Sequence, residues 1–91
     1  MGQTQAEYFT SDIYEASSLV AAGVQLVRVD PGFGGRKEFV FPDTEDAAKA
    51  VNDYVNATLV LNIQTFIGAW RRLRRAVDDN GGNIRYEKFK R

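Results

Sequence analysis

One segment, Asn62 to Asp79, limits what this chain can fold into, because it has the longest uninterrupted helical periodicity in the sequence. At about 100° per residue its apolar side chains fall on one face of a helix, which predicts that this face is buried. Asn62 is suited to cap the first turn, and the pair Gly81-Gly82 is expected to end the helix. The predicted buried face comprises Ile63, Phe66, Ile67, Trp70, Leu73 and Val77, with Ala69 and Ala76 at its border.

Two further helices are predicted before this segment. Residues 7–10 form a short strand, and the helix after it is expected to be capped by Thr10 or Ser11 and to end at Gly23. The second helix follows at residues 44–56, capped by Asp43. Its predicted inner side comprises Ala47, Ala48, Val51, Tyr54 and Val55.

A β-hairpin is predicted between these two helices. The segments VQLVRVD (24–30) and RKEFVFP (36–42) are rich in β-branched and aromatic residues and flank a glycine-rich turn. With a period of two residues, one face of the hairpin carries Val27, Val29, Phe39 and Phe41 and the other carries Leu26 and Val40. We therefore expect Phe39 and Phe41 to face the helices, unlike the base-stacking aromatics of an RNA-recognition motif.

The order of elements predicts an α+β fold. If residues 57–62 form a short strand, the order is strand, helix, strand, strand, helix, strand, helix, which is a ferredoxin-like βαββαβ arrangement with an added C-terminal helix. The added helix could then cover the sheet face that Leu26 and Val40 leave apolar. The alternative is one β-hairpin packed against three helices, with residues 57–62 as an extended connection.

Length and composition predict one small domain spanning residues 1–91, since 91 residues with 44% apolar content suffice for one core. Residues 1–6 and 82–91 are expected to be flexible ends. No apolar run approaches the roughly eighteen residues that span a bilayer, and the first residues do not resemble a signal peptide. We therefore expect a cytoplasmic protein without a membrane partner.

The absence of cysteine and histidine excludes disulfides, thiol nucleophiles, imidazole bases and the usual structural zinc sites. The acidic groups at residues 43–46 and 78–79 lie at predicted helix ends, where the helix dipole, solvent or nearby arginines explain them. No nucleophile, base and orienting group occur together. The sequence therefore predicts a protein that is not an enzyme, with no catalytic, cofactor-binding or metal-binding residue.

The N-terminal half contains a recognisable motif, Thr10-Ser11-Asp12-Ile13-Tyr14, preceded by Tyr8-Phe9. Together with the hairpin that ends in Phe39-Val40-Phe41 and the Leu-Val-Leu segment before the long helix, it resembles a family of short prokaryotic and phage domains of unknown function. The resemblance covers about residues 7–78 and leaves out the basic tail. It implies an ordered small domain and supplies no catalytic residue.

The charge of the chain is unevenly distributed although its formal net charge is zero. Residues 1–70 contain four Lys or Arg against nine Asp or Glu, a net of −5, and residues 71–91 contain eight against three, a net of +5. The basic part begins with the cluster Arg71-Arg72-Leu73-Arg74-Arg75. Such a cluster either binds a polyanion or balances the acidic helices of the same domain.

The arginine cluster gives the functional hypothesis. Arg71, Arg72 and Arg75 lie on the outer side of the predicted helix, where they could contact phosphates, while Arg74 falls between Trp70 and Ile67 on its apolar side. We therefore expect a small macromolecule-binding domain whose partner is nucleic acid. The alternative is protein–protein interaction or self-association as a homodimer, because Arg74 could mark the place where another chain docks.

Overall fold

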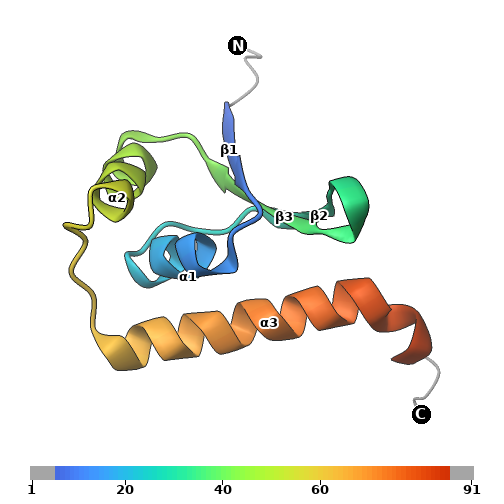
Figure 1. Ribbon diagram of the computed structural model, residues 1–91. Coiled ribbons are helices and arrows are strands. Elements are labelled where there is room, and N and C mark those ends of the chain that lie inside the picture. Colours follow the sequence, from blue (N-terminus) through green and yellow to red (C-terminus); the bar gives the residue numbers. More distant parts are fainter. Residues whose placement is uncertain (1–5, 87–91) are drawn as a thin grey trace.

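The α+β class predicted from the sequence is confirmed (Figure 1). The computed structural model describes residues 6–86, without the side chains of Phe33 and of residues 79–86. In chain order the elements are β1 (Glu7–Thr10), α1 (Ile13–Ala21), β2 (Arg28–Pro31), a short 3-10 turn η1 (Phe33–Gly35), β3 (Lys37–Pro42), α2 (Glu45–Val55) and α3 (Ile63–Tyr86).

The three strands form one antiparallel sheet in the order β1-β3-β2. Tyr8 is paired with Phe41 on one side of the central strand, and Val29 is paired with Phe39 on the other. Because β3 lies between β1 and β2, the segment β1-α1-β2 is the split β-α-β unit expected for the first half of a ferredoxin-like domain.

The fourth strand of the ferredoxin-like arrangement does not form, because residues 57–62 are an extended connection outside the sheet. The backbone N–H groups of Thr58 and Leu59 both donate to the carbonyl of Asp53, at 2.8 and 3.2 Å. These donors are used to close the end of α2, so they are not available to a neighbouring strand. The connection then leads directly to Asn62, which caps α3.

Two helix caps differ from the prediction by one residue. The N-cap of α1 is Asp12, which accepts from the backbone N–H of Tyr14 at 2.9 Å, while Thr10 accepts from the N–H of Asp12. The N-cap of α2 is Thr44 instead of Asp43, and its hydroxyl accepts from the N–H of Ala47. In both cases the cap is the residue whose oxygen reaches a free N–H of the first turn.

Both α1 and α2 end in the same Schellman motif. After α1, Gly23 (φ 101°) donates to the carbonyl of Val20, and the next residue, Val24, donates to Leu19. After α2, Ala57 occupies the equivalent position with φ 61° and donates to the carbonyl of Tyr54. The predicted stop at Gly23 is confirmed, whereas the left-handed alanine after α2 was not predicted.

The hairpin turn depends on close backbone contact. The N–H of Gly32 donates to the carbonyl of Arg36 at 2.6 Å, and a Cβ at position 32 would lie 2.8 Å from that oxygen. Only glycine fits without displacement, so the glycine-rich segment serves the turn, as expected.

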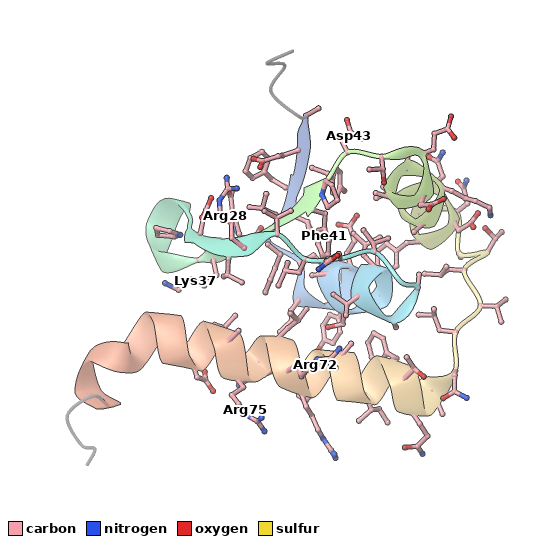
Figure 2. The ribbon with its side chains drawn as sticks, turned by 180° about the vertical axis from the view of Figure 1, so that it is seen from behind. Arg28, Lys37, Phe41, Asp43, Arg72 and Arg75 are labelled. Atoms are coloured by element: carbon pink, nitrogen blue, oxygen red, sulfur yellow. The ribbon has the colours of Figure 1, made fainter. Side chains whose placement is uncertain are left out.

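All three helices contribute to a core on one face of the sheet. Phe39 and Phe41 are buried there with Leu19 of α1, Ala47 of α2 and Leu73 of α3. In Figure 2, Lys37 on β3 points toward α3 whereas Arg28 on β2 points away from it. The prediction that the last helix covers the opposite face is therefore wrong.

The first hairpin strand is shorter than predicted, and the residues before it do not face the core as expected. Leu26 packs against the core, while Val27, which was expected to face the core, is exposed. The alternation does not hold for residues 24–27, which connect the Schellman turn of α1 to β2. The strand starts at Arg28, although the N–H of Val27 already donates to the carbonyl of Val40 on β3.

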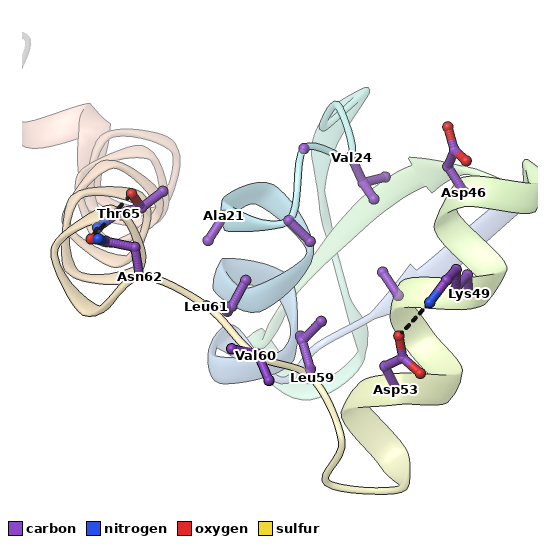
Figure 3. A pocket seen from close by; sticks show the side chains of 13 residues that line it. Ala21, Val24, Asp46, Lys49, Asp53, Leu59, Val60, Leu61, Asn62 and Thr65 are labelled. Carbon is purple, nitrogen blue, oxygen red and sulfur yellow. Dashed lines mark hydrogen bonds and ion pairs between the residues drawn. The ribbon is translucent and has the colours of Figure 1, made fainter.

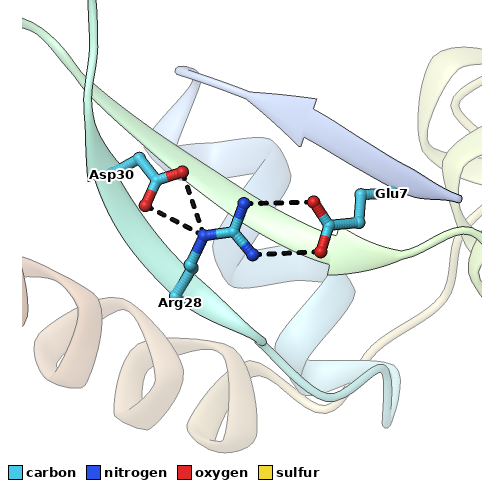
Figure 4. Close-up of polar contacts among 3 residues, drawn as sticks. All are labelled: Glu7, Arg28 and Asp30. Atoms are coloured by element: carbon cyan, nitrogen blue, oxygen red, sulfur yellow. Dashed lines mark hydrogen bonds and ion pairs between the residues drawn. The ribbon is translucent and has the colours of Figure 1, made fainter. Parts of the chain in front are cut away.

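The outer face of the sheet is covered by charged side chains and not by a helix. Arg28 donates to both carboxylate oxygens of Glu7 at 3.0 and 3.1 Å, and its Nε lies 3.0 Å from both oxygens of Asp30 (Figure 4). Arg28 is paired with Val40 in the sheet, so its side chain reaches across β3 above that valine. This explains how Val40 is 0% exposed on a face without a helix.

The long helix α3 is capped by Asn62, as predicted, since its Oδ1 accepts from the N–H groups of Gln64 and Thr65. The helix is rotated about its own axis relative to the prediction, so a different set of side chains is buried. Ala69 is 1% exposed and Leu73 4%, whereas Ile63 is 63% exposed and Trp70 is only partly buried. The helix also continues through Gly81-Gly82 to Tyr86, because two glycines lower helix stability by about 1 kcal/mol each without forbidding the conformation.

The inner side of α2 also differs from the prediction. Ala47 and Ala50 are buried and Val51 packs against the core, but Ala48 is exposed and Val55 is 70% exposed. The last turn of α2 therefore projects beyond the core.

The buried position of Leu73 predicts a large effect of truncation. Leu73→Ala should lower the free energy of unfolding by about 2–5 kcal/mol, because it leaves a cavity where α3 meets the core. The exposed Val55 serves as the control, and Val55→Ala should change stability by less than about 0.5 kcal/mol. Urea unfolding followed by circular dichroism measures both, and equal effects would show that α3 is not docked through Leu73.

The two Schellman motifs predict opposite effects of exchanging glycine and alanine. Gly23→Ala should destabilise the domain by about 1 kcal/mol through backbone strain alone, because a Cβ at this position meets no atom within 4 Å. Ala57→Gly removes the same strain and should be neutral or stabilising by up to about 1 kcal/mol. Thermal melting of both variants tests this, and a strong loss of stability in Ala57→Gly would contradict it.

Candidate functional site

The candidate site is the solvent-facing side of α3, where all four predicted arginines are exposed. At 3.6 residues per turn, Arg71 and Arg75 lie about 40° apart on the side opposite the buried Leu73. Arg74 lies on one flank of this outer side, and Arg72 lies about 200° away from it on the other flank. The structure therefore separates Arg72 from Arg74 although only Leu73 lies between them in the sequence. Figure 2 shows Arg72 and Arg75 pointing in different directions from α3.

A shallow hollow of about 340 Å³ occurs on the Arg74 flank, lined by Trp70, Arg71, Arg74, Arg75 and Asp78. The guanidinium carbon of Arg74 lies 5.4 Å from the centre of the Trp70 ring, which is a cation–π contact. The indole Nε1 is buried and has no hydrogen-bond partner among the described residues. Arg74 is thus held against the tryptophan, whereas Arg71 and Arg75 extend into solvent.

None of the four arginines forms an ion pair with a carboxylate whose side chain the structure describes. The described ion pairs join Arg28 to Glu7 and Asp30, and Lys49 to Asp53. Arg28 lowers the pKa of Glu7 through its hydrogen bonds, and Lys49 lowers that of Asp53. These carboxylates are therefore satisfied by other cations, and Arg71, Arg72, Arg74 and Arg75 keep their charge available.

A second polar cluster surrounds Glu15, which is buried in the first turn of α1. Its carboxylate accepts hydrogen bonds from the hydroxyls of Tyr8 and Thr10, at 2.6 and 2.7 Å. Burial, followed by the hydrogen bond to Glu15, raises the pKa of Tyr8 to about 12. Tyr54 also donates to the α1 cap, Asp12, at 3.4 Å, and burial raises its pKa. These contacts join β1 and α2 to the start of α1. The polar cluster around Glu15 therefore has a role in holding these elements together.

Two larger grooves flank the connection 57–62. One, of about 500 Å³, lies between the end of α1, α2 and the start of α3, and Figure 3 shows Val24, Leu59 and Leu61 around it. Its polar groups Lys49 and Asp53 are paired with each other. The other groove, of about 540 Å³, is mainly apolar and is lined by Ser18, Tyr54, Ala57, Leu59, Leu61, Ile63 and Phe66.

The described residues contain no cluster of three or more acidic side chains arranged to bind a metal ion. Within the same part of the chain, no helix combines the length and apolar character needed to cross a bilayer.

Sequence reasoning located the arginines but missed the Glu15 cluster. Glu15 was overlooked because one acidic residue in the first turn of a helix is normally exposed. The available signal was the spacing of Tyr8, Thr10 and Glu15, since alternation along a strand places residues 8 and 10 on the same face.

Comparison with known proteins gives one match. The family model for a domain of unknown function (DUF5659) matches residues 5–78, which include all four arginines of the candidate site. No curated protein and no solved structure matches the chain.

The raised pKa of Tyr8 predicts a loss of stability at high pH. Between pH 10 and about 12 the unfolded state releases the phenolic proton while the folded state retains it, so stability falls as the pH rises. Tyr8→Phe should remove this part of the fall. Urea unfolding from pH 8 to 12 measures it, with the exposed Tyr14→Phe as the control, and an unchanged fall in Tyr8→Phe would contradict the assignment.

Proposed function

The chain belongs to the DUF5659 family, whose function is unknown, and we propose that this domain binds nucleic acid without catalysing a reaction. The observation that supports this proposal is the set of exposed arginines on α3 without a carboxylate partner among the described residues. Clustered arginines bind phosphates by charge and by paired hydrogen bonds, and they gain affinity from released counterions.

Arg71 and Arg75 form the centre of the proposed interface. They are four positions apart on one stripe of α3, so both can reach phosphates of the same nucleic-acid strand. Arg72 extends the contact on one flank. The helix beneath them is fixed by buried Ala69 and Leu73, which positions the guanidinium groups without a conformational change.

The competing explanation is that these arginines neutralise the acidic helices of the same domain. In Figure 1, α2 lies at the end of the molecule where α3 begins, but separated from α3 and away from the middle of the helix where the arginines lie. The acidic residue of α2 that forms an ion pair, Asp53, uses Lys49 of the same helix. Among the described residues, therefore, no acidic side chain neutralises these arginines by an ion pair.

Recognition is proposed to depend on the phosphate backbone with weak sequence preference. The aromatic residues of the central strand, Phe39 and Phe41, are buried against the helices and cannot stack on bases. A cytoplasmic location suits this role, and the T-S-D-Ile-Tyr motif suggests a prokaryotic or phage source.

The proposal predicts strongly salt-dependent binding. With three phosphate contacts, the slope of log affinity against log salt should be roughly −2 to −3, and Arg71→Ala or Arg75→Ala should each flatten it by about one. Fluorescence anisotropy with labelled single-stranded and double-stranded oligonucleotides measures the slope.

Arg36→Ala is the matched control, because Arg36 is an exposed arginine on the hairpin at a different place in the fold. It should leave the slope unchanged. Absence of binding at low salt, or a loss of stability on removing Arg71 and Arg75 together, would favour internal neutralisation and reject the proposal.

A further inference from the structure

A second stripe of side chains on α3 is not used by the core. Ile63, Ile67, Trp70 and Arg74 follow one another at intervals of four, three and four residues, which is the spacing of a helix–helix seam. Ile63 is 63% exposed, and Ile67 and Trp70 are partly exposed. The sequence alone assigned Ile63, Ile67 and Trp70 to the core, but Ala69 and Leu73 on the adjacent stripe are the buried residues of this helix.

The two ends of this stripe differ in shape. At its N-terminal end, Ile63 projects beside the apolar groove that also includes Tyr54, Leu59 and Leu61. At its C-terminal end lies the hollow formed over Trp70, between Arg74 and its neighbours. A protruding aliphatic side chain and a shallow hollow thus lie on the same flank of the helix, about three turns apart.

We infer that this stripe is the interface with a second copy of the same chain, with the two α3 helices antiparallel. The spacing is self-complementary in this orientation. A two-fold axis between residues 68 and 69 places Ile63 of one copy opposite Arg74 of the other, and Ile67 opposite Trp70. Ile63 then enters the hollow over Trp70, and the partner's Arg74 extends its aliphatic stem over the apolar groove.

Charge selects the antiparallel orientation over the parallel one. A parallel seam would bring the arginines of both copies together, whereas residues 62–70 carry no charged side chain and can lie beside the partner's arginines without repulsion.

This interface uses Arg74, and the partner's Ile63 also comes close to Arg71 and Arg75, which line the same hollow. Arg74 lies on the seam flank, while Arg71 and Arg75 lie on the outer side and Arg72 on the opposite flank. The dimer is tested at Ile63 and Arg74 and nucleic-acid binding at Arg71 and Arg75, so the failure of one proposal is distinguishable from the failure of the other.

A charge-exchange experiment tests the register. Sedimentation velocity of the wild-type chain should show a dimer at high concentration. Ile63→Lys opposes the partner's Arg74 and should raise the dimer dissociation constant by about tenfold or more, and Arg74→Glu should also weaken the dimer. The double variant Ile63→Lys/Arg74→Glu pairs the new lysine with the new glutamate of the partner and should restore association.

Val60→Lys is the control, because Val60 is 90% exposed on the neighbouring connection but lies outside the stripe, and it should leave the dimer intact. Circular dichroism checks that each variant is folded. A wild-type monomer at every concentration, or a dimer indifferent to Ile63→Lys, would overturn the inference.

The chain contains no cysteine, so the orientation can be tested by disulfide formation. A mixture of Ile63→Cys and Arg74→Cys chains should give the mixed disulfide on mild oxidation in preference to either symmetric product. A predominance of the symmetric Ile63→Cys product would show a parallel seam and would overturn the antiparallel assignment.

Discussion

The packing of α3 against α1 and the edge strand β2 is the interaction on which the rest of the structure depends. Ala69 and Leu73 are buried there, and Phe39 and Phe41 of β3 complete the core from the sheet side. This contact fixes the rotation of α3 about its own axis. Because every side chain on the helix then has a defined direction, the same contact decides which arginines face solvent and which apolar residues remain uncovered.

The rotation of α3 was the part of the fold that the sequence predicted least well. Periodicity correctly indicated a helix capped by Asn62, but it favoured the large side chains Ile63 and Ile67 as the buried face. The structure buries Ala69 instead. Since α1 is buried between the sheet and α3 and presents the small residues Ala16, Ser17 and Ser18, close approach of the helices favours a small residue over a large one.

The connection 57–62 shows a second limit of sequence reasoning. Its residues have the composition of a strand, and hydrophobicity does not distinguish a strand from an extended connection. The deciding interactions are the hydrogen bonds from Thr58 and Leu59 to Asp53, which depend on the left-handed conformation of Ala57. A non-glycine residue in that conformation leaves no clear signal in one sequence. By contrast, Gly23 at the equivalent turn after α1 was identified from its residue type alone.

The net charge of the chain does not indicate which interactions its individual charged side chains form. Arg28 satisfies two carboxylates on the outer sheet face and shields Val40, so one cation replaces a covering helix there. The four arginines between Arg71 and Arg75 form no such ion pair among the described residues, and their directions divide them between the two proposed roles. In an antiparallel pair, a two-fold axis perpendicular to both helices keeps corresponding side chains on the same surface of the dimer. Arg71 and Arg75 of both copies would then face the same way. Self-association through Arg74 would therefore join two short phosphate-binding surfaces into one longer surface. The longer surface would bind nucleic acid more tightly without any new contact within either chain.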